Sequence, residues 1–402
     1  MLRFIHAADI HLDSPLRGLA VYEGAPVDTL RGATRAAFVN LVDQAIEAEV
    51  HFMVVAGDLY DGDWPDFNTG LFFAQQMGRL KSRNIPVIIV LGNHDAASTI
   101  TKQLTWPDNV HILSHRKPET VRLDDLRVAI HGQSFPQRDV FENIAASYPL
   151  PVAGYFNIGM LHTALTGRPP HALYAPCSVE ELVARGYDYW ALGHVHTYEI
   201  VLESPYIVFP GNLQGRHIRE TGDRGAVLIT VDDRIHVRRM LVNTLRWELL
   251  DVDVSEAADL TAVAVACAEG LRAQLDSAGD LPLAVRVRLI GATHLHGRLV
   301  DATGQLREEV LAQAVALDAQ RLWIEKVVSA TTPAASTTDT VVAHDTLTEV
   351  QANMERSASD AAFLEAIRRD VEEILAKVPA AIMEHSAIYY TDLLKVNRAS
   401  SR

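Results

Sequence analysis

The stretch HFMVVAGD at residues 51–58 decides the fold, because it is an apolar run that ends at once in glycine and a carboxylate. Two further stretches have the same form, FIHAAD at residues 4–9 and IPVIIVLGN at residues 85–93. Each is typical of a short buried strand followed directly by a polar side chain. Ligand sites in open α/β sheets lie beyond the carboxyl ends of the strands. We therefore expect the three terminal residues to lie close together: Asp9, Asp58 and Asn93.

Helical periodicity separates these strands, from about residue 29 to 48 and from 67 to 81. The alternation favours a mixed α/β sheet covered by helices. From about Asn157 the pattern becomes β-rich, with short strands separated by Gly, Pro and Asp turn signals. It predicts a second layer of sheet.

The chain is long enough for more than one domain, since 402 residues suggest two or three. After Trp247 a helical run and the strand LAVRVRLIG indicate a small α+β domain. The stretch SATTPAASTTD at 329–339 is small, polar and non-periodic, as linkers are. The predicted organisation is a large α/β domain, a small α+β domain, a linker and a helical segment, at residues 1–246, 247–328, 329–344 and 345–402.

Composition narrows the possible functions. A hydrophobic fraction of 48% and a charged fraction of 22% are those of a folded, soluble chain. The net charge of −15 argues against a broad grip on nucleic acid by the whole surface, although it allows a local site. The N-terminus has no long apolar export signal, and no apolar run approaches the roughly 18 residues of a membrane span. With only two cysteines, Cys177 and Cys267, we expect a cytoplasmic protein that binds any metal through His, Asp and Asn.

Five polar clusters have the composition of metal ligands. They are DIH at 9–11, GDLYD at 57–61, GNHD at 92–95, His162 in MLHTAL, and GHVH at 193–196. The outer residues of DIH and the histidines of GHVH are two apart, and in an extended chain such side chains share a face. Oxygen and imidazole ligands without thiolate suit Mn²⁺, Fe²⁺ or Zn²⁺, and a carboxylate can bridge two ions. A single cluster is more often structural, but all five together, each beyond a β run, indicate a metal site.

The order DxH, GDxxD, GNHD, isolated His, GHxH resembles that of the calcineurin-like metallophosphoesterase superfamily. The segments FIHAADIHLDSPLRG, VVAGDLYDGD, VLGNHD, ALGHVH and FPGNLQGRHIRE are similar to SbcD-type DNA repair nuclease subunits, especially the YhaO-like branch. The similarity covers about residues 1–240. It implies a layered α/β/β/α sandwich, to which the small α+β domain and the C-terminal helical segment are added.

The resemblance also implies roles for the clustered residues. One ion would be held by Asp9, His11, Asp58 and His196, and the other by Asp58, Asn93, His162 and His194. Asp58 would then bridge two divalent ions, for which Mn²⁺ is the expected metal. In the family, the histidine that corresponds to His94 faces the scissile phosphate, and Asp95 could orient it.

Three further features are less specific. Arg216 and His217 form the best basic cluster near the site and are predicted to contact substrate phosphate, although such arginines are usually solvated or paired with acids such as Glu220. Asp61 could act in the site or could only hold its own loop. The HLH at 294–296 has HxH spacing without nearby carboxylates, so we expect a loop there.

Three functions remain open. The resemblance implies a nuclease acting on DNA ends or hairpins, as a homodimer with an SbcC-like coiled-coil ATPase and without a membrane. The same metal site would serve a small-molecule or cyclic-nucleotide phosphodiesterase, and a third possibility is an assembly subunit with a vestigial site. The helical segment could dock on the ATPase or pack on its own chain, through an apolar face at Leu364, Ile367, Val371, Ile374 and Val378.

Overall fold

The structure is a computed structural model that describes residues 1–14, 27–61, 68–97, 106–166, 174–301 and 303–334, together with Glu365. The chain divides into two units, Met1–Ala334 and Ala335–Arg402. Apart from Glu365, the second unit lies outside the described residues. The helical segment predicted at 345–402 and the linker predicted beyond residue 334 therefore stay predictions.

The first sheet contains the strands expected within residues 4–9, 51–58 and 85–93. Its strands are β1 (Leu2–Ala7), β2 (Phe52–Ala56), β3 (Val87–Val90), β4 (Val110–Ile112), β11 (Gly225–Val231) and β12 (Ile235–Leu241). They follow the order β12-β11-β1-β2-β3-β4. The neighbours β1, β2, β3 and β4 are parallel, whereas β11 pairs antiparallel with β1 and with β12. All five residues of β2 are buried, as expected for a central strand covered on both faces.

The second sheet also has six strands. They are β5 (Glu119–Leu123), β6 (Val128–Gly132), β7 (Phe156–His162), β8 (Tyr189–Gly193), β9 (Glu199–Glu203) and β10 (Tyr206–Phe209). Their order is β5-β6-β7-β8-β10-β9, with four parallel inner strands and an antiparallel strand at each edge. The β-rich second layer predicted from the sequence is confirmed.

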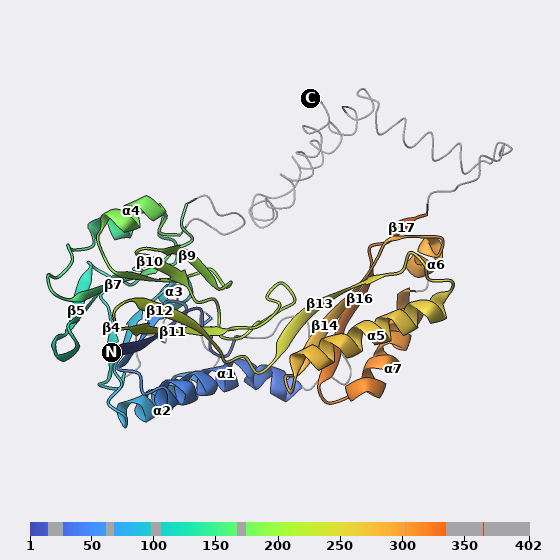
Figure 1. Ribbon diagram of the computed structural model, residues 1–402, viewed down its shortest axis with the longest axis horizontal. Helices are drawn as coiled ribbons and strands as arrows, with labels where there is room; N and C mark the ends of the chain where they lie inside the picture. Colours follow the sequence, from blue (N-terminus) through green and yellow to red (C-terminus); the bar gives the residue numbers. More distant parts are fainter. Residues whose placement is uncertain are drawn as a thin grey trace, which may run out of the picture. The chain divides into compact units, whose positions relative to one another are not determined.

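Helices cover the outer faces of the two sheets (Figure 1). The long helices α1 (Val27–Glu47) and α2 (Asn68–Lys81) pack on the first sheet, where Phe38 and Met77 are fully buried. The short helix α4 (Val179–Ala184) lies over the second sheet. Between the sheets, the stacked rings of Phe4 and Phe52 are 4.8 Å apart and belong to one core with residues of β6, β7 and β8. The layers are thus α/β/β/α, and the predicted fold class is confirmed.

A smaller sheet follows the sandwich. Its three parallel strands are β13 (Arg246–Asp253), β14 (Leu283–Ile290) and β16 (Leu322–Ser329), and α5 (Leu260–Ala278) and α7 (Thr303–Asp318) cover one face of it (Figure 1). Helix α6 (His296–Asp301) and the short strands β15 (Ala292–Thr293) and β17 (Thr332–Pro333) complete this part. The Ala330 amide donates to Leu289 and the Ala334 amide to Thr293. Residues 330–334, which the sequence assigned to a linker, are therefore hydrogen-bonded into this fold.

The first strand of the small sheet is tied to a loop of the sandwich. Trp247 in β13 is 1% exposed, and its indole Nε1 donates to the Gly215 carbonyl at 2.9 Å. The Gly222 amide in turn donates to the Trp247 carbonyl at 2.9 Å. The loop between β10 and β11 is therefore anchored on Trp247. Among the described residues, no helix is both long and apolar enough to cross a membrane.

Candidate metal centre

The side chains predicted as ligands converge at the carboxyl ends of strands from both sheets. Asp9 and His11 follow β1, Asp58 follows β2, and Asn93 begins the short helix α3 (Asn93–Ala97) after β3. From the second sheet, His162 ends β7, and His194 and His196 follow β8. Three groups have ligand atoms within 4.8 Å of one another: Asp9 with His11 and His196, His11 with Asp58 and His94, and Asp58 with His162 and His194. These groups contain six of the seven predicted ligands, all but Asn93, together with His94.

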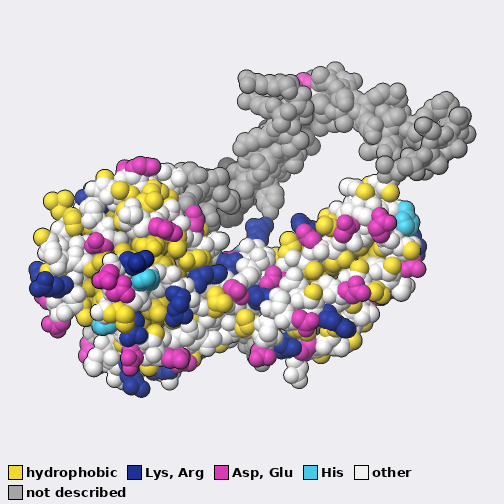
Figure 2. Space-filling model, viewed as in Figure 1, with side chains coloured by type: hydrophobic (Ala, Val, Ile, Leu, Met, Phe, Trp, Pro, Cys, Tyr) yellow, Lys and Arg dark blue, Asp and Glu magenta, His cyan; other side chains and the backbone are white. Residues whose placement is uncertain are grey.

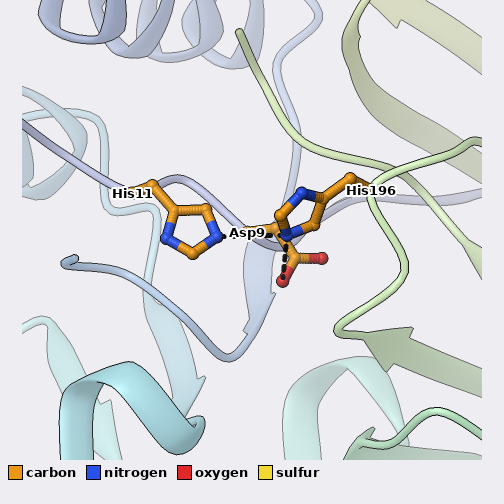
Figure 3. A group of neighbouring side chains, drawn as sticks. All are labelled: Asp9, His11 and His196. Atoms are coloured by element: carbon orange, nitrogen blue, oxygen red, sulfur yellow. Dashed lines mark hydrogen bonds and ion pairs between the residues drawn. The ribbon is translucent and has the colours of Figure 1, made fainter. Parts of the chain in front are cut away.

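In the first group, Asp9, His11 and His196 point toward one another (Figure 3). The Nε2 atoms of His11 and His196 are 3.2 Å apart, and His196 Nε2 lies 3.9 Å from Asp9 Oδ1. Both oxygens of Asp9 also accept the His194 amide, at 3.1 and 3.0 Å. Asp9 and His11 are fully buried, whereas the His196 side chain is 24% exposed and lies at the edge of the cluster.

The second group surrounds Asp58. His162 Nε2 lies 3.4 Å from Asp58 Oδ2 and 3.0 Å from Asn93 Oδ1. The Asp58 Oδ1 atom accepts the His94 amide at 3.0 Å, so the carboxylate is oriented by the backbone at the start of α3. The other oxygen, Oδ2, lies 3.9 Å from His11 Nε2. Asp58 therefore reaches both groups, as a bridging ligand must.

The chemistry of these atoms fits divalent cations. His162 Nδ1 donates to the Ala56 carbonyl at 3.0 Å, so in a neutral ring Nε2 carries a lone pair toward Asn93 and Asp58. The Nε2 atoms of His11 and His196 lie 3.2 Å apart, close enough for both to reach one ion. Imidazole with carboxylate oxygen is a ligand set that binds divalent transition metals.

The electrostatic interactions of Asp58 also favour a bound cation. Burial acts to raise the pKa of Asp58, but the adjacent His162 holds it well below its usual range. Burial likewise acts to lower the pKa of His162, yet the Asp58 carboxylate raises it to about 9. These shifts show that the Asp58 carboxylate strongly favours a positive charge beside it, the interaction that a bound cation would use.

Glycines leave room for this cluster. A Cβ on Gly92 would lie 2.3 Å from Asp58 Oδ1, and one on Gly57 would lie 2.3 Å from His162 Nδ1. A Cβ on Gly193 would lie 1.9 Å from the Ala56 carbonyl oxygen. The glycines of GDLYD, GNHD and GHVH are thus required by close approach.

The local backbone differs from the extended chain assumed for DIH. Strand β1 ends at Ala7, and Asp9 and His11 have φ angles of 50° and 45°. Asp58 and His194 also have positive φ, at 51° and 95°. The side chains of Asp9 and His11 do meet, but a left-handed turn brings them together. The prediction that these two side chains share one face of an extended strand is therefore wrong, although the side chains do lie close together.

The imidazole of His94 contacts the carboxylate of Asp61. His94 Nδ1 lies 2.9 Å from Asp61 Oδ1, and the Ser14 hydroxyl donates to Asp61 Oδ2 at 2.7 Å. Burial acts against protonation of His94, but the hydrogen bond to Asp61 raises its pKa. Asp61, left undecided by the sequence, therefore belongs to the site. Its spacing of three from Asp58 was the available signal.

The role predicted for Asp95 needs correction. Its carboxylate accepts the backbone amides of Leu59, Tyr60 and Gly92, at 3.1, 2.9 and 3.0 Å. Burial, followed by the nearby charge of Asp58, raises the pKa of Asp95 to about 7. Asp95 therefore joins the GDLYD and GNHD loops, and the orienting contact with His94 is made by Asp61 instead.

Arg216 lies inside a network of acids. Its side chain is only 13% exposed, with Nη2 3.2 Å from Glu220 Oε1 and Nη1 3.7 Å from Asp61 Oδ2. Glu220 Oε1 also lies 2.7 Å from His196 Nδ1. His217 is about one-third exposed, and its Nε2 lies 3.6 Å from the same Glu220 oxygen. Arg216 is thus engaged by protein groups, as the alternative considered from the sequence had it, and phosphate contact by Arg216 and His217 stays a prediction.

The HLH of the small domain forms no comparable cluster among the described residues. His296 Nδ1 contacts the Thr331 hydroxyl at 3.0 Å, and His294 Nε2 lies 3.3 Å from the Ala258 carbonyl oxygen.

Glu220 contacts a predicted ligand, but the sequence indicated it only as a partner for arginine. Its position four residues after Arg216 gave no signal of the contact with His196.

Comparison with known proteins adds two family matches. The family described as calcineurin-like phosphoesterase matches residues 2–198. The family described as the middle domain of metallophosphoesterase YhaO matches residues 247–332.

Individual relatives agree with these matches. The chain is 39% identical over 267 residues to the uncharacterized metallophosphoesterase YhaO of Bacillus subtilis, a stretch that covers 65% of each protein. It is 29% identical over 212 residues to the DNA double-strand break repair protein Mre11 of Methanopyrus kandleri, covering 48% of this chain and 44% of that protein. The Mre11 protein of Sulfurisphaera tokodaii is 26% identical over 277 residues, covering 63% and 67%. The chain thus spans just under two thirds of the Bacillus relative and less than half of the Methanopyrus one.

Proposed function

The chain belongs to the calcineurin-like metallophosphoesterase superfamily, in its YhaO-like branch, and on this premise we propose that it is a two-metal phosphodiesterase that cleaves DNA at ends or hairpins, as SbcD-type nucleases do. The convergence of carboxylate and imidazole groups from both sheets carries this proposal. The named Mre11 relatives favour DNA as the substrate.

In this proposal, one Mn²⁺ ion would be held by Asp9, His11, Asp58 and His196, and the other by Asp58, Asn93, His162 and His194. When bound, two such ions stabilise the attacking and leaving oxygens of an in-line displacement at phosphorus. The chain supplies a shielded site for that charge, since Asp9, His11 and Asp58 are buried.

His94 is the proposed catalytic side chain at the rim of this centre. Its side chain is 35% exposed, whereas its partner Asp61 is 18% exposed. With Nδ1 on Asp61, the remaining ring nitrogen Nε2 is the one available to substrate. A protonated His94 can stabilise negative charge on the phosphoryl group or give its Nε2 proton to the leaving oxygen. Asp61 favours that protonated form, as the raised pKa of His94 indicates.

A small-molecule phosphodiesterase is the second candidate. Figure 2 shows acidic and basic side chains interspersed over the drawn face. The net charge of −15 also makes a long-range attraction for a polyanion weak. Both observations suit a small substrate, whereas the Mre11 relatives suit DNA.

One comparison of substrates separates the two candidates. Purified protein with Mn²⁺ is assayed on linear duplex DNA, hairpin DNA and bis(p-nitrophenyl) phosphate, with Asp58→Asn as the inactive control. We expect cleavage of DNA and of the simple diester, both lost in Asp58→Asn. Cleavage of the diester or a cyclic nucleotide without DNA cleavage would support the second candidate. If nothing is cleaved, the vestigial assembly subunit gains support.

The proposed function includes two protein partners of this chain. An SbcC-like ATPase and a second copy of this chain are expected to bind it. Apart from Glu365, the segment 345–402, proposed to dock on the ATPase, lies outside the described residues.

A further inference from the structure

The carboxylate of Glu220 is held on every side by donors. Glu220 is 5% exposed and lies in the loop between β10 and β11. Its Oε2 accepts the Arg216 amide at 2.7 Å and Asn212 Nδ2 at 2.9 Å. Its Oε1 contacts His196 Nδ1 at 2.7 Å and accepts Arg216 Nη2 at 3.2 Å. With two partners for each oxygen, the carboxylate has no freedom to rotate without losing hydrogen bonds.

These contacts fix the protonation of His196. An ionised carboxylate only accepts hydrogen bonds, so at 2.7 Å the proton must lie on His196 Nδ1. Arg216 Nη2 is 3.4 Å from the same nitrogen, but a guanidinium only donates, and its shorter contact is with Glu220. A neutral imidazole carries one proton, so His196 Nε2 has the free lone pair. That atom faces His11 Nε2 and Asp9 Oδ1.

The loop that carries Glu220 is itself immobilised. Gln214 Nε2 donates to the Leu245 carbonyl at 2.8 Å, and Gln214 Oε1 accepts the Thr244 amide at 2.9 Å. A Cβ on Gly215 would lie 2.5 Å from the Glu220 carbonyl oxygen and 2.9 Å from Trp247 Cδ1. The main chain around Glu220 therefore packs against the strand that begins the small sheet. Its carboxylate cannot follow His196 if that ring moves.

We propose that Glu220 is a positioning residue, which holds His196 with its Nε2 lone pair directed at the metal position shared with Asp9 and His11. The inference rests on the metal centre of the proposed function, but not on DNA being the substrate. Carboxylates that accept from a metal-bound histidine fix its tautomer and orientation in many metalloproteins.

The variant Glu220→Gln tests the role with little change of volume. A glutamine offers one acceptor oxygen and one NH₂ donor group. If the oxygen faces His196, the NH₂ group faces two donors, the Arg216 amide and Asn212 Nδ2. If the amide is reversed, NH₂ faces His196 Nδ1 and favours the tautomer whose Nε2 is protonated. Either arrangement weakens the orientation of His196.

Metal binding is the primary measurement. Mn²⁺ is titrated into metal-free full-length protein by calorimetry, and the visible spectrum of Co²⁺-loaded protein reports ligand geometry. We expect Glu220→Gln to bind one of two ions about 10–100-fold more weakly, with an altered Co²⁺ spectrum. The matched control is Glu203→Gln, an exposed glutamate of β9, which should match wild type. Wild-type affinity and an unchanged spectrum in Glu220→Gln would overturn the proposal.

A double-mutant cycle separates positioning from general damage. If Glu220 acts through His196, Glu220→Gln adds no further loss of Mn²⁺ affinity to His196→Ala. A further loss of the same size in that background would mean that Glu220 only maintains the fold, and the proposal would fail. If wild-type protein itself binds fewer than two ions, the proposed metal centre is at fault, which is a distinct outcome.

Discussion

Four residues of the metal centre, Asp9, His11, Asp58 and His194, have positive φ, which residues other than glycine rarely adopt. Backbone hydrogen bonds hold two of them in place, since the Asp9 amide donates to Gly57 and the His11 amide to Asp58, both at 3.0 Å. Such conformations persist only where the surrounding structure determines them. The inward turn of the side chains is therefore a property of the folded chain itself.

Asp58 is the residue whose loss should affect both ions. In Asp58→Asn the shape is kept, but the carboxylate that lies beside both His162 and His11 loses its charge. We expect both Mn²⁺ ions to bind at least about 100-fold more weakly, with phosphodiesterase activity lost in parallel. Elemental analysis and calorimetry measure this, with exposed Asp233→Asn as the control. Retention of both ions would show that Asp58 is not the bridge.

His94 and Asp61 should affect turnover without loss of metal. His94→Ala is expected to keep both ions and to lose about 10²–10⁴-fold in kcat, as removal of a general acid does. Asp61→Asn replaces the charged acceptor beside His94 with a neutral one, so the pKa of His94 falls and the histidine loses its proton at a lower pH. If protonated His94 is the active form, the alkaline fall of the pH–rate profile moves to lower pH. An alkaline fall that does not move would contradict this role.

At the scale of elements, local patterns predicted the strands but not their neighbours. The stretch FIHAA overlaps β1, and HFMVVAG and IPVIIVLG contain β2 and β3, because apolar runs ending in turn residues specify buried strands. Nothing in GAVLITV shows that β11 pairs with β1, where Ile5 lies opposite Leu228. Pairing between distant segments depends on how the whole chain packs.

The same limit applies to the site. The convergence of these residues could be predicted because they lie at or just beyond strand ends, which meet at one edge of a sheet. Their roles as ligands were implied by the resemblance to the superfamily. The carboxylates that contact the site histidines could not be predicted, because Asp61 contacts His94 and Glu220 contacts His196 across loops of irregular conformation. Asp95 was assigned to His94 by adjacency, yet its carboxylate turns to three backbone amides.

The loop at the end of β3 offers a steric test. In Gly92→Ala the new Cβ would lie 2.3 Å from Asp58 Oδ1 and 2.8 Å from the Asp58 amide nitrogen, so the carboxylate must move. We expect at least about 10-fold weaker Mn²⁺ binding, as for loss of an orienting contact. The matched control is Gly78→Ala in α2, where no atom lies within 4 Å of the added Cβ. That change should leave metal binding intact and stabilise the helix by about 0.4–1 kcal/mol. Equal Mn²⁺ affinity in both variants would refute the steric account.

At the scale of the whole molecule, the unit Met1–Ala334 contains every residue assigned to the metal centre. Its hydrophobic clusters also lie within these residues, both in the sandwich and in the small sheet. Burial of apolar surface is the main stabilising contribution to folding. This unit therefore has the core and the site of an independently folding metalloprotein.

Removing residues 335–402 tests that independence together with the proposed docking segment. The metal centre and the hydrophobic cores lie before residue 335. The truncated chain should therefore keep its unfolding midpoint and bind two Mn²⁺ ions. It should also cleave bis(p-nitrophenyl) phosphate at close to the full-length rate. Co-purification with an SbcC-like ATPase should be lost, since the apolar positions at Leu364, Ile367 and Val371 have the spacing of a helix that binds in a groove. A matched full-length variant, Ile367→Asp with Val371→Asp, should lose the ATPase and retain cleavage. If the truncated chain is insoluble or loses its metal, the segment belongs to the core of the protein. If the double variant still binds the ATPase fully, this face is not the docking site.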